Sequence, residues 1–317
     1  MSSEDIAIRL WPAHKLEHNV TFENADEERR RLGNFKENHM FIHNFNIHNK
    51  KYHYCRHNQL SHWSHEEYIA WLTLKPGLTQ HLLQPGSTQQ SSKQPEQVSK
   101  ELKSSLPSVV DWKAIGKVTN IKNQGRCGSC WSFSATGAIE SAYAIKTGEL
   151  INFSEQQLVD CSTQNNGCDG GLPAVAFQYV IENGIMRWRD YPYTGQQGTC
   201  QYSSKDVVKI SSYQYVAPNE TSLMEAVATI GPISIAINAS SRSFQFYGGG
   251  IYYDPLVPSY PLDHAVLLAG YGYQNNDNFW YVKNSWGTWW GEQGYVYIKR
   301  DDDNYLGVTS CASYPIM

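Results

Sequence analysis

The longest amphipathic pattern in the chain lies near its N-terminus, in residues 24–50. This stretch is rich in charged and amide side chains and contains few residues that break helices. Six of its side chains follow one another at spacings of three or four, so a helix would place them on one face. They are Glu27, Arg31, Phe35, Asn38, Ile42 and Asn46. The pattern predicts a long helix, and taken alone it is typical of an ordinary amphipathic one.

A second helical pattern covers residues 132–147 and ends at Gly148. Its apolar residues that return at helical spacing are Ala138, Ile139, Ala142, Tyr143, Ala144 and Ile145. The residues from Gln124 to Trp131 read Gln-Gly-Arg-Cys-Gly-Ser-Cys-Trp, which places Cys130 at or near the helix start. A helix N-terminus presents unpaired N–H groups and about half a positive charge, and both favour the nucleophilic thiolate over the thiol.

The rest of the pattern separates a helical half from a β half. Two more helices are predicted around residues 154–160 and 173–183. Beyond about residue 211, short β-branched and aromatic runs predict strands, namely residues 233–237, 265–269, 279–283 and 294–298. The pattern therefore favours an α+β fold, and the cleft between the two halves is the expected place for chemistry.

Composition narrows the function classes. At 317 residues and 36.0 kDa the chain can bury a substantial core. A net charge of −4 gives no footprint for nucleic acid, and no apolar run approaches the roughly 18 residues that a membrane span needs. Residues 86–105 are rich in Gln and Ser without apolar periodicity, which predicts an exposed linker.

The cysteines and the N-terminus give conflicting indications of the cellular compartment. Residues 1–7 contain neither the basic region nor the apolar core of a signal peptide. Five of the seven cysteines nevertheless lie between residues 127 and 200, which indicates disulfides and an oxidising compartment. We therefore expect a secretion signal that this sequence does not include.

The spacing of Cys127 and Cys130 also fits two other kinds of site. Half of a zinc site would need a second close cysteine pair, whereas Cys161 and Cys168 are seven residues apart. A thioredoxin-like redox pair is expected near a βαβ pattern, which this sequence lacks. Neither alternative is favoured.

The histidines are distributed unevenly. Of the 11, ten precede residue 82 and only His264 follows. If Cys130 works with an imidazole of the same folded unit, that imidazole is His264, as a base or as the charged partner of the thiolate. Imidazoles gain charge between about pH 7 and 6, so the early histidines suggest a pH response, with His53, His57, His62 and His65 as candidates. The simpler interpretation is that they solvate a helix.

Together these motifs resemble the papain family of cysteine proteases, closest in pattern to its cathepsin L-like branch. Residues 124–131 fit the C-G-[SA]-C-[WY] signature, in which His and Asn follow roughly 130 to 150 residues downstream. Here His264 follows Cys130 by 134 residues and Asn284 by 154. Further matching blocks are Gly167-Cys168-Asp169-Gly170-Gly171, Asp263-His264-Ala265-Val266 and Asn284-Ser285-Trp286-Gly287. The six-residue face of residues 24–50 resembles the ERFNIN motif of the branch's propeptide, so the resemblance covers about residues 20–317.

The resemblance implies a papain-like, two-lobed α+β fold preceded by a helical propeptide. Residues 1–105 would be an inhibitory propeptide that lies through the cleft, and cleavage near residues 104–106 would release a catalytic domain of residues 106–317. A helical lobe of about residues 106–210 and a β-barrel-like lobe of about residues 211–317 would enclose the cleft. The second propeptide motif departs from the family, because His62 stands in place of Asp and Arg56 in place of Gly.

The family's roles carry over to four catalytic residues. Cys130 would attack the peptide carbonyl to form a thioester, and His264 would protonate the leaving amine and then activate water. Asn284 would hold the imidazole, with Trp286 shielding that hydrogen bond. Gln124 and the backbone N–H of Cys130 would stabilise the oxyanion. The resemblance also pairs Cys127 with Cys168 and Cys161 with Cys200, leaving Cys130 free, and implies no metal or cofactor.

Substrate-binding residues follow in the same way. Gly170 and Gly171 would let the substrate backbone pair closely, and Asp263 belongs to the histidine motif. The pocket for the second residue before the cut would comprise Leu172, Pro173, Ala236, Leu262, Ala265 and Cys311. All are apolar or nearly so, which favours Leu, Val, Ile or Phe and leaves no acid to receive Arg.

The resulting expectation is the zymogen of a monomeric, lysosomal or extracellular cysteine endopeptidase. Its partners would be polypeptide substrates, its own propeptide and cystatin-like inhibitors, without nucleic acid or membrane. The alternatives are an inactive papain-like homologue that binds or stores, and a transferase or ligase that uses the same acyl-enzyme. Glycosylation sequons stand at Asn19, Asn152, Asn219 and Asn238, of which Asn152, in an apolar-looking stretch, is expected to be used least.

Overall fold

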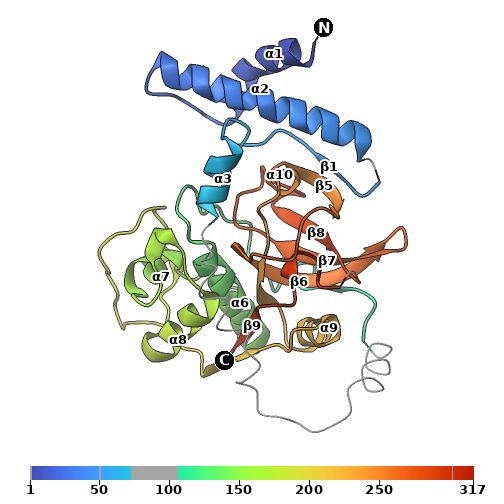
Figure 1. Cartoon of the computed structure of the whole chain (residues 1–317). Coiled ribbons are helices and arrows are strands. Elements are labelled where there is room, and N and C mark those ends of the chain that lie inside the picture. Colours follow the sequence, from blue (N-terminus) through green and yellow to red (C-terminus); the bar gives the residue numbers. More distant parts are fainter. Residues whose placement is uncertain (1, 50, 73–105, 302) are drawn as a thin grey trace.

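The computed structural model describes residues 2–49, 51–72, 106–301 and 303–317. The expected linker at residues 86–105 and most of the expected cleavage region lie outside the described residues. Within them, an N-terminal segment of residues 2–72 packs on a larger C-terminal part (Figure 1).

The N-terminal segment is mainly helical. It consists of α1 (Ser3–Glu17), α2 (Ala25–His48), strand β1 (His53–Cys55) and α3 (His65–Trp71). The long helix predicted from residues 24–50 is confirmed as α2, which begins where the Asn24 side chain caps two N–H groups. Four residues of the predicted face are buried: Arg31, Phe35, Asn38 and Ile42. Ala7, Trp11 and Phe35 form a small core between α1 and α2.

The helical half of the C-terminal part surrounds one central helix. This helix is α6 (Cys130–Thr147), and it ends at Gly148 in a left-handed conformation, as the sequence predicts. Beside it lie α7 (Glu155–Cys161) and α8 (Pro173–Asn183), both confirmed, and the short 3-10 helices Gly167–Asp169 and Trp188–Asp190. Residues from α6, α7, α8 and β6 form one buried core, so the central helix is held between helices and sheet.

The β half is a single large sheet. Its strands are β2 (Val110–Asp111), β3 (Ser212–Tyr215), β4 (Ile233–Ile237), β5 (Tyr247–Tyr252), β6 (His264–Gln274), β7 (Asp277–Lys283), β8 (Tyr295–Lys299) and β9 (Ala312–Ile316). The order is β1-β5-β8-β7-β6-β4-β9-β3, with β2 paired to β6. Helices α9 (Glu220–Thr229) and α10 (Arg242–Gln245) and the 3-10 helix Tyr305–Gly307 complete it. The four predicted strand runs are confirmed as β4, β6, β7 and β8.

Two contacts tie the N-terminal segment to the C-terminal part. Strand β1 adds to the edge of the sheet, with Tyr54 opposite Gly249 in antiparallel register on β5. Helix α3 lies between α2 and the C-terminal part (Figure 1), and its Tyr68 hydroxyl donates to the Ala239 carbonyl at 2.5 Å. The N-terminal segment is therefore held on the C-terminal part by both backbone pairing and side-chain packing.

One sequon expectation is wrong. Asn152 is exposed, because it lies in the loop just before the buried Phe153. Asn238 is instead fully buried, and its side-chain amide donates to the Pro258 carbonyl at 2.8 Å. Burial of that amide, and not the apolar pattern around Asn152, makes Asn238 the sequon that cannot be reached in the folded chain.

Candidate active site

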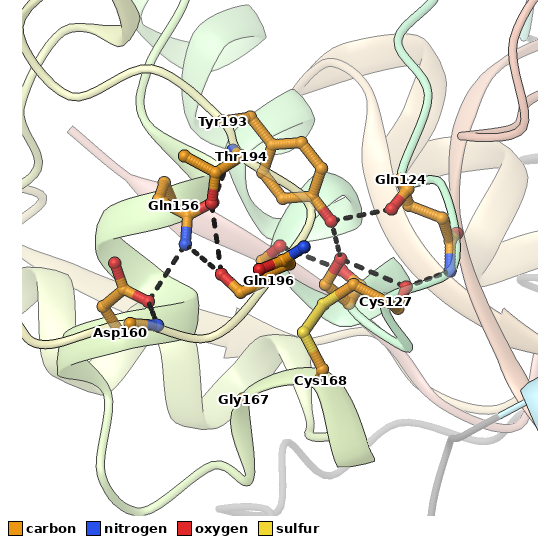
Figure 2. The surroundings of a disulfide bond; sticks show 12 residues. Gln124, Cys127, Gln156, Asp160, Gly167, Cys168, Tyr193, Thr194 and Gln196 are labelled. Atoms are coloured by element: carbon orange, nitrogen blue, oxygen red, sulfur yellow. Dashed lines mark hydrogen bonds between the residues drawn. A yellow bond between two sulfur atoms is a disulfide. The ribbon is translucent and has the colours of Figure 1, made fainter.

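Cys130 is the first residue of α6, as expected, and a disulfide holds the loop before it. Cys127 is bonded to Cys168 and Cys161 to Cys200, which confirms both expected pairs. Figure 2 shows the first of these bonds beside Gln124 and Tyr193. All seven cysteines are described, and Cys55, Cys130 and Cys311 are free. Because Cys127 is in a disulfide, it forms neither a redox pair nor half a zinc site with Cys130.

The β half brings His264 to the thiol. His264 is the first residue of β6 and lies opposite Ile237 of β4. The next residue, Ala265, donates its backbone N–H to Sγ of Cys130 at 3.5 Å. Cys130 and Ala265, which are 135 positions apart in the chain, are thus neighbours at the junction of helix and sheet.

The imidazole is held by Asn284, which directly follows β7. Nε2 of His264 lies 2.7 Å from Oδ1 of Asn284. That oxygen also accepts the backbone N–H of Ser285 at 2.8 Å, which identifies it as the carbonyl side of the amide. A carbonyl oxygen only accepts, so Nε2 must carry the proton and Nδ1 is the basic nitrogen of the neutral ring. Trp286 covers this bond, with its ring centre 4.7 Å from that of His264.

Burial shifts the pKa values of Cys130 and His264 away from their charged forms. Cys130 and His264 are each about 1% exposed. Loss of solvation raises the pKa of the Cys130 thiol to about 12, although the Ala265 N–H opposes this. Loss of solvation also lowers the pKa of His264 to about 4, against the effect of its bond to Asn284. In the intact chain, burial therefore disfavours the charged form of each group.

Gln124 is fixed by four hydrogen bonds to neighbours of the site. Its Oε1 accepts the Ser285 hydroxyl at 2.7 Å, and its Nε2 donates to the Cys127 carbonyl at 3.0 Å. Its backbone N–H donates to the Ser285 carbonyl at 2.8 Å, and its carbonyl accepts the Tyr193 hydroxyl at 2.8 Å (Figure 2). The second N–H of the amide has no partner among the described residues. The orientation of the amide is thus fixed by Ser285 and Cys127, and one of its two N–H groups remains for another partner.

The residues expected to form the specificity pocket lie around Cys130. Leu172, Ala236, Leu262 and Ala265 form one buried cluster with Cys130, and Cys311 packs against it. Pro173 lines a small hollow together with Leu172, Ala236 and Cys311. The six residues named from the sequence therefore come from α8, β4, β6 and three loops to a single place.

The remaining residues expected to bind substrate are Gly170, Gly171 and Asp263, and the structure gives each of them a packing or backbone role. A Cβ added at Gly171 would come within 2.5 Å of Oδ1 of Asn165, so packing inside the protein already demands glycine there. Gly170 has a φ of 106°, a conformation that favours glycine. Oδ1 of Asp263 accepts the Ala239 N–H at 2.7 Å, and burial raises the pKa of that carboxyl to about 7. Asp263 is thus occupied in holding the backbone beside the site.

Sequence reasoning missed several residues of the site. Ser285 binds both Gln124 and Asn284, and its only signal was its place inside the Asn-Ser-Trp-Gly block. Tyr68 and Trp71 of α3 pack on Trp286 with ring centres 5.9 and 5.1 Å away. No local pattern signals that contact.

Among the described residues, no helix combines the length and hydrophobicity that crossing a membrane requires.

Comparison with known proteins agrees with this geometry. Residues 106–316 match the family model described as papain family cysteine protease, and residues 11–68 match the cathepsin propeptide inhibitor domain. A cathepsin L-like peptidase of Aedes aegypti is 43% identical over 327 residues, which cover 100% of this chain and 95% of that protein. Procathepsin L of Mus musculus is 50% identical over 220 residues, 67% of this chain and 66% of that protein.

A solved structure agrees over nearly the whole chain. The digestive procathepsin L 3 of the Tenebrio molitor larval midgut aligns with a TM-score of 0.86 and 37% identity, covering 98% of this chain and 99% of that one. The helices and mixed sheet thus form an α+β papain-like fold with N-terminal propeptide helices. The chain belongs to the papain family of cysteine proteases and is a cathepsin L-like zymogen that carries its own inhibitory propeptide.

Proposed function

We propose that Cys130 cuts polypeptides through a thioester intermediate, with a preference for apolar residues at the second position before the cut. The observation that carries the proposal is a pair of hydrogen bonds made by two consecutive residues, His264 and Ala265. Ala265 N–H lies 3.5 Å from Sγ of Cys130, and the neighbouring His264 is held through Nε2 by Asn284. This arrangement leaves Nδ1 of His264 as the base on the side of the ring opposite Asn284.

The first half of the reaction forms the acyl-enzyme. The Cys130 proton passes to Nδ1 of His264, and the sulfur attacks the substrate carbonyl. The negative charge that develops on the carbonyl oxygen is stabilised by the free N–H of the Gln124 amide and the backbone N–H of Cys130. The C–N bond then breaks as the leaving amine takes the proton from His264, and a thioester to Cys130 remains.

The second half returns the enzyme to its starting state. A water molecule gives its proton to Nδ1 of His264 and adds to the thioester carbonyl. The C–S bond breaks, the acid product leaves and the sulfur regains its proton. Asn284 supports both halves, because a neutral carbonyl oxygen next to Nε2–H stabilises the charged imidazolium without taking its proton.

The pocket argument rests on what surrounds the thiol. Leu172, Pro173, Ala236, Leu262, Ala265 and Cys311 offer apolar surface next to Cys130. Burying an apolar side chain there is favourable by about 1.5–3 kcal/mol, whereas an Arg would enter without a carboxylate partner. Leu, Val, Ile and Phe are therefore the expected residues.

The propeptide is proposed to keep the enzyme latent by covering this region. Helix α3 places Tyr68 and Trp71 on Trp286, the residue that covers the histidine. The two disulfides support folding in an oxidising compartment, so we assign the protein to the secretory route, ending in a lysosome or outside the cell.

The test is incubation of the precursor at acidic pH, N-terminal sequencing of the product and a cleavage profile on a peptide library. We expect a new N-terminus near residues 104–106 and enrichment of Leu, Val, Ile or Phe two residues before each cut. Replacement Cys130→Ala should abolish both. Precursor that neither matures nor reacts with an epoxysuccinyl thiol inhibitor would favour an inactive homologue. Transfer of the acyl group to an added amine in preference to water would favour a transferase.

A further inference from the structure

A groove of about 270 Å³ lies between the catalytic domain and the propeptide. On the catalytic side it is lined by Asn123, Gly125, Arg126 and Trp289. These residues flank Gln124, and Asn123 forms a backbone bridge with Trp286. The wall of the groove therefore starts at the residues proposed to stabilise the oxyanion and to cover the histidine.

This wall lies apart from the apolar pocket. The groove shares no lining residue with the hollow formed by Leu172, Pro173, Ala236 and Cys311. An extended substrate leaves the reacting carbonyl in two opposite directions. If residues before the cut occupy the apolar pocket, residues after the cut must take the other side of Cys130. The wall formed by Arg126 and Trp289 flanks Gln124 and is separate from the apolar pocket, so we assign it to the residues after the cut.

The wall carries a cation without a carboxylate partner. Arg126 is exposed and forms no ion pair with any described residue. Its guanidinium instead lies over the ring of Trp63 of the propeptide, 5.9 Å from the ring centre. The other titratable groups that line the groove are His18 and His62, and no Asp or Glu is among its described lining residues. The groove is therefore suited to an acidic side chain.

The propeptide, which now fills this side of the cleft, presents matching chemistry. A second hollow next to the groove is lined by Arg31, Trp63, Glu67, Ala70, Trp71 and Arg126. The Glu67 carboxylate lines it together with Arg126, although its ion pairs are with Arg30 and Arg31 at 3.0 and 2.7 Å. The segment held against the wall thus brings aromatic rings and one carboxylate to it.

Resting on the proposed endopeptidase function, we propose that Arg126 is a specificity residue that selects substrates with an acidic side chain within the first three positions after the cut. The Trp289 ring provides the apolar surface beside it. Once the propeptide leaves, Arg126 loses its contact with Trp63 and faces the incoming substrate. A partly exposed Arg–carboxylate pair is weak, so the expected selectivity is about two- to fivefold. The pair is also screened by salt.

The experiment uses matured enzyme and fluorogenic peptides that are identical before the cut. Each of the first three positions after the cut carries Glu, Gln or Lys in turn, and kcat/KM is measured at low and high salt. We expect Glu to exceed Lys by about two- to fivefold in at least one position at low salt, and by less at high salt. Replacement Arg126→Gln should remove the difference, and Arg126→Glu should reverse it.

The control is Lys146→Gln, an exposed cation near the far end of α6, which should keep the preference of the wild type. None of these three variants should change the preference for apolar residues before the cut, because the apolar pocket is separate from the wall. Cleavage of all peptides at equal rates, or a preference for Glu that survives Arg126→Gln, would overturn the inference while leaving the protease function intact. Failure of every peptide to be cut, with Cys130 unreactive, would instead overturn the proposed function.

Discussion

His14 and His62 form an imidazole–imidazole hydrogen bond inside the propeptide, with Nε2 of the first 3.2 Å from Nδ1 of the second. A second pair lies nearby, since Nδ1 of His39 is 2.9 Å from Nε2 of His57. The Phe35 ring lies between the pairs, 4.8 Å from His14 and 4.5 Å from His57 by ring centres. Each pair holds one shared proton, and charging both rings would turn two N–H groups toward each other. Each pair can therefore keep its hydrogen bond only while at least one of its two rings is neutral.

The surroundings of the two histidine pairs also disfavour protonation, because they lower the pKa values of the rings. Burial, together with the nearby His18, His62 and His57, lowers the pKa of His14 to about 3. Burial lowers the pKa of His62 to about 4, helped by Arg31, Arg126 and His18 and opposed by Glu67. Burial also lowers the pKa of His57 to about 4, and it lowers the pKa of His39. Unfolded histidines take up protons near pH 6.5, so the unfolded propeptide binds more protons than the folded one.

The first prediction is that the propeptide loses stability as the pH falls below about 6.5, while the histidine contribution is complete above that pH. For His14 alone the loss at pH 5 is about 2 kcal/mol. We expect maturation to accelerate over this range. The double variant His14→Gln with His62→Gln should flatten the dependence and shift its midpoint by about half a pH unit or more to lower pH. The measurement is the maturation rate between pH 4 and 7.

Its control is His48→Gln, at the exposed end of α2, which should leave the profile unchanged. The shape of the profile is the readout, because a variant that merely weakens the propeptide would speed maturation at every pH. A double variant with the wild-type midpoint and slope would show that these histidines only solvate the helices.

The second prediction concerns the packing of α3 on the catalytic domain. Trp71 is buried against Trp286, with ring centres 5.1 Å apart. Truncating a buried tryptophan costs about 3–5 kcal/mol, so Trp71→Ala should loosen the propeptide. The expected result is faster alkylation of Cys130 in the intact precursor at neutral pH. Ile69→Ala, on the exposed face of the same helix, should alkylate at the wild-type rate. Equal rates for both variants would refute a latching role for Trp71.

The third prediction concerns Asn284, which holds the imidazole at 2.7 Å. Hydrogen bonds to charged groups contribute about 1.5–3 kcal/mol, so Asn284→Ala should lower kcat about ten- to a hundredfold. The loss should be greatest where His264 must be charged, because the carbonyl dipole then has most to stabilise. Kinetics of matured enzyme across pH provide the check, and an unchanged kcat would mean that strand β6 alone orients the ring.

The fourth prediction concerns Gln124. One N–H of its amide donates to the Cys127 carbonyl, and the other is proposed to bind the oxyanion. Loss of an oxyanion donor typically costs about 10²- to 10³-fold in kcat. Gln124→Ala should show this loss with little change in KM, while Cys130 stays reactive toward a small alkylating agent that forms no oxyanion. A matching fall in alkylation would indicate instead that Gln124 only supports the loop.

Much of this arrangement was accessible from the sequence because it depends on local chemistry. Gly148 ends α6 and Asn24 begins α2 through conformations and caps that only nearby residues decide. The motif around Cys130 and the single late histidine also named the nucleophile and its partner. The bond between Asn284 and His264 then needed only the observed pairing of β6 with β7.

The rest depends on contacts that no local pattern encodes. Trp71 reaches Trp286 across 215 positions, and His14 reaches His62 across 48. The exposure of Asn152 and the burial of Asn238 follow from how loops pack on the sheet, which apolar composition alone misjudges. The sequence did not indicate the proposed role of Arg126 either, because that role depends on the groove that Arg126 lines.

The central claim is that the Cys130 sulfur carries the acyl group during turnover. The most direct measurement is rapid acid quenching of matured enzyme during hydrolysis of a slow ester substrate, followed by mass spectrometry of its peptides. The account predicts the acyl mass on the peptide that contains Cys130, appearing and decaying at rates consistent with turnover. Turnover with no acyl group on Cys130, or with the group on another residue, would contradict it.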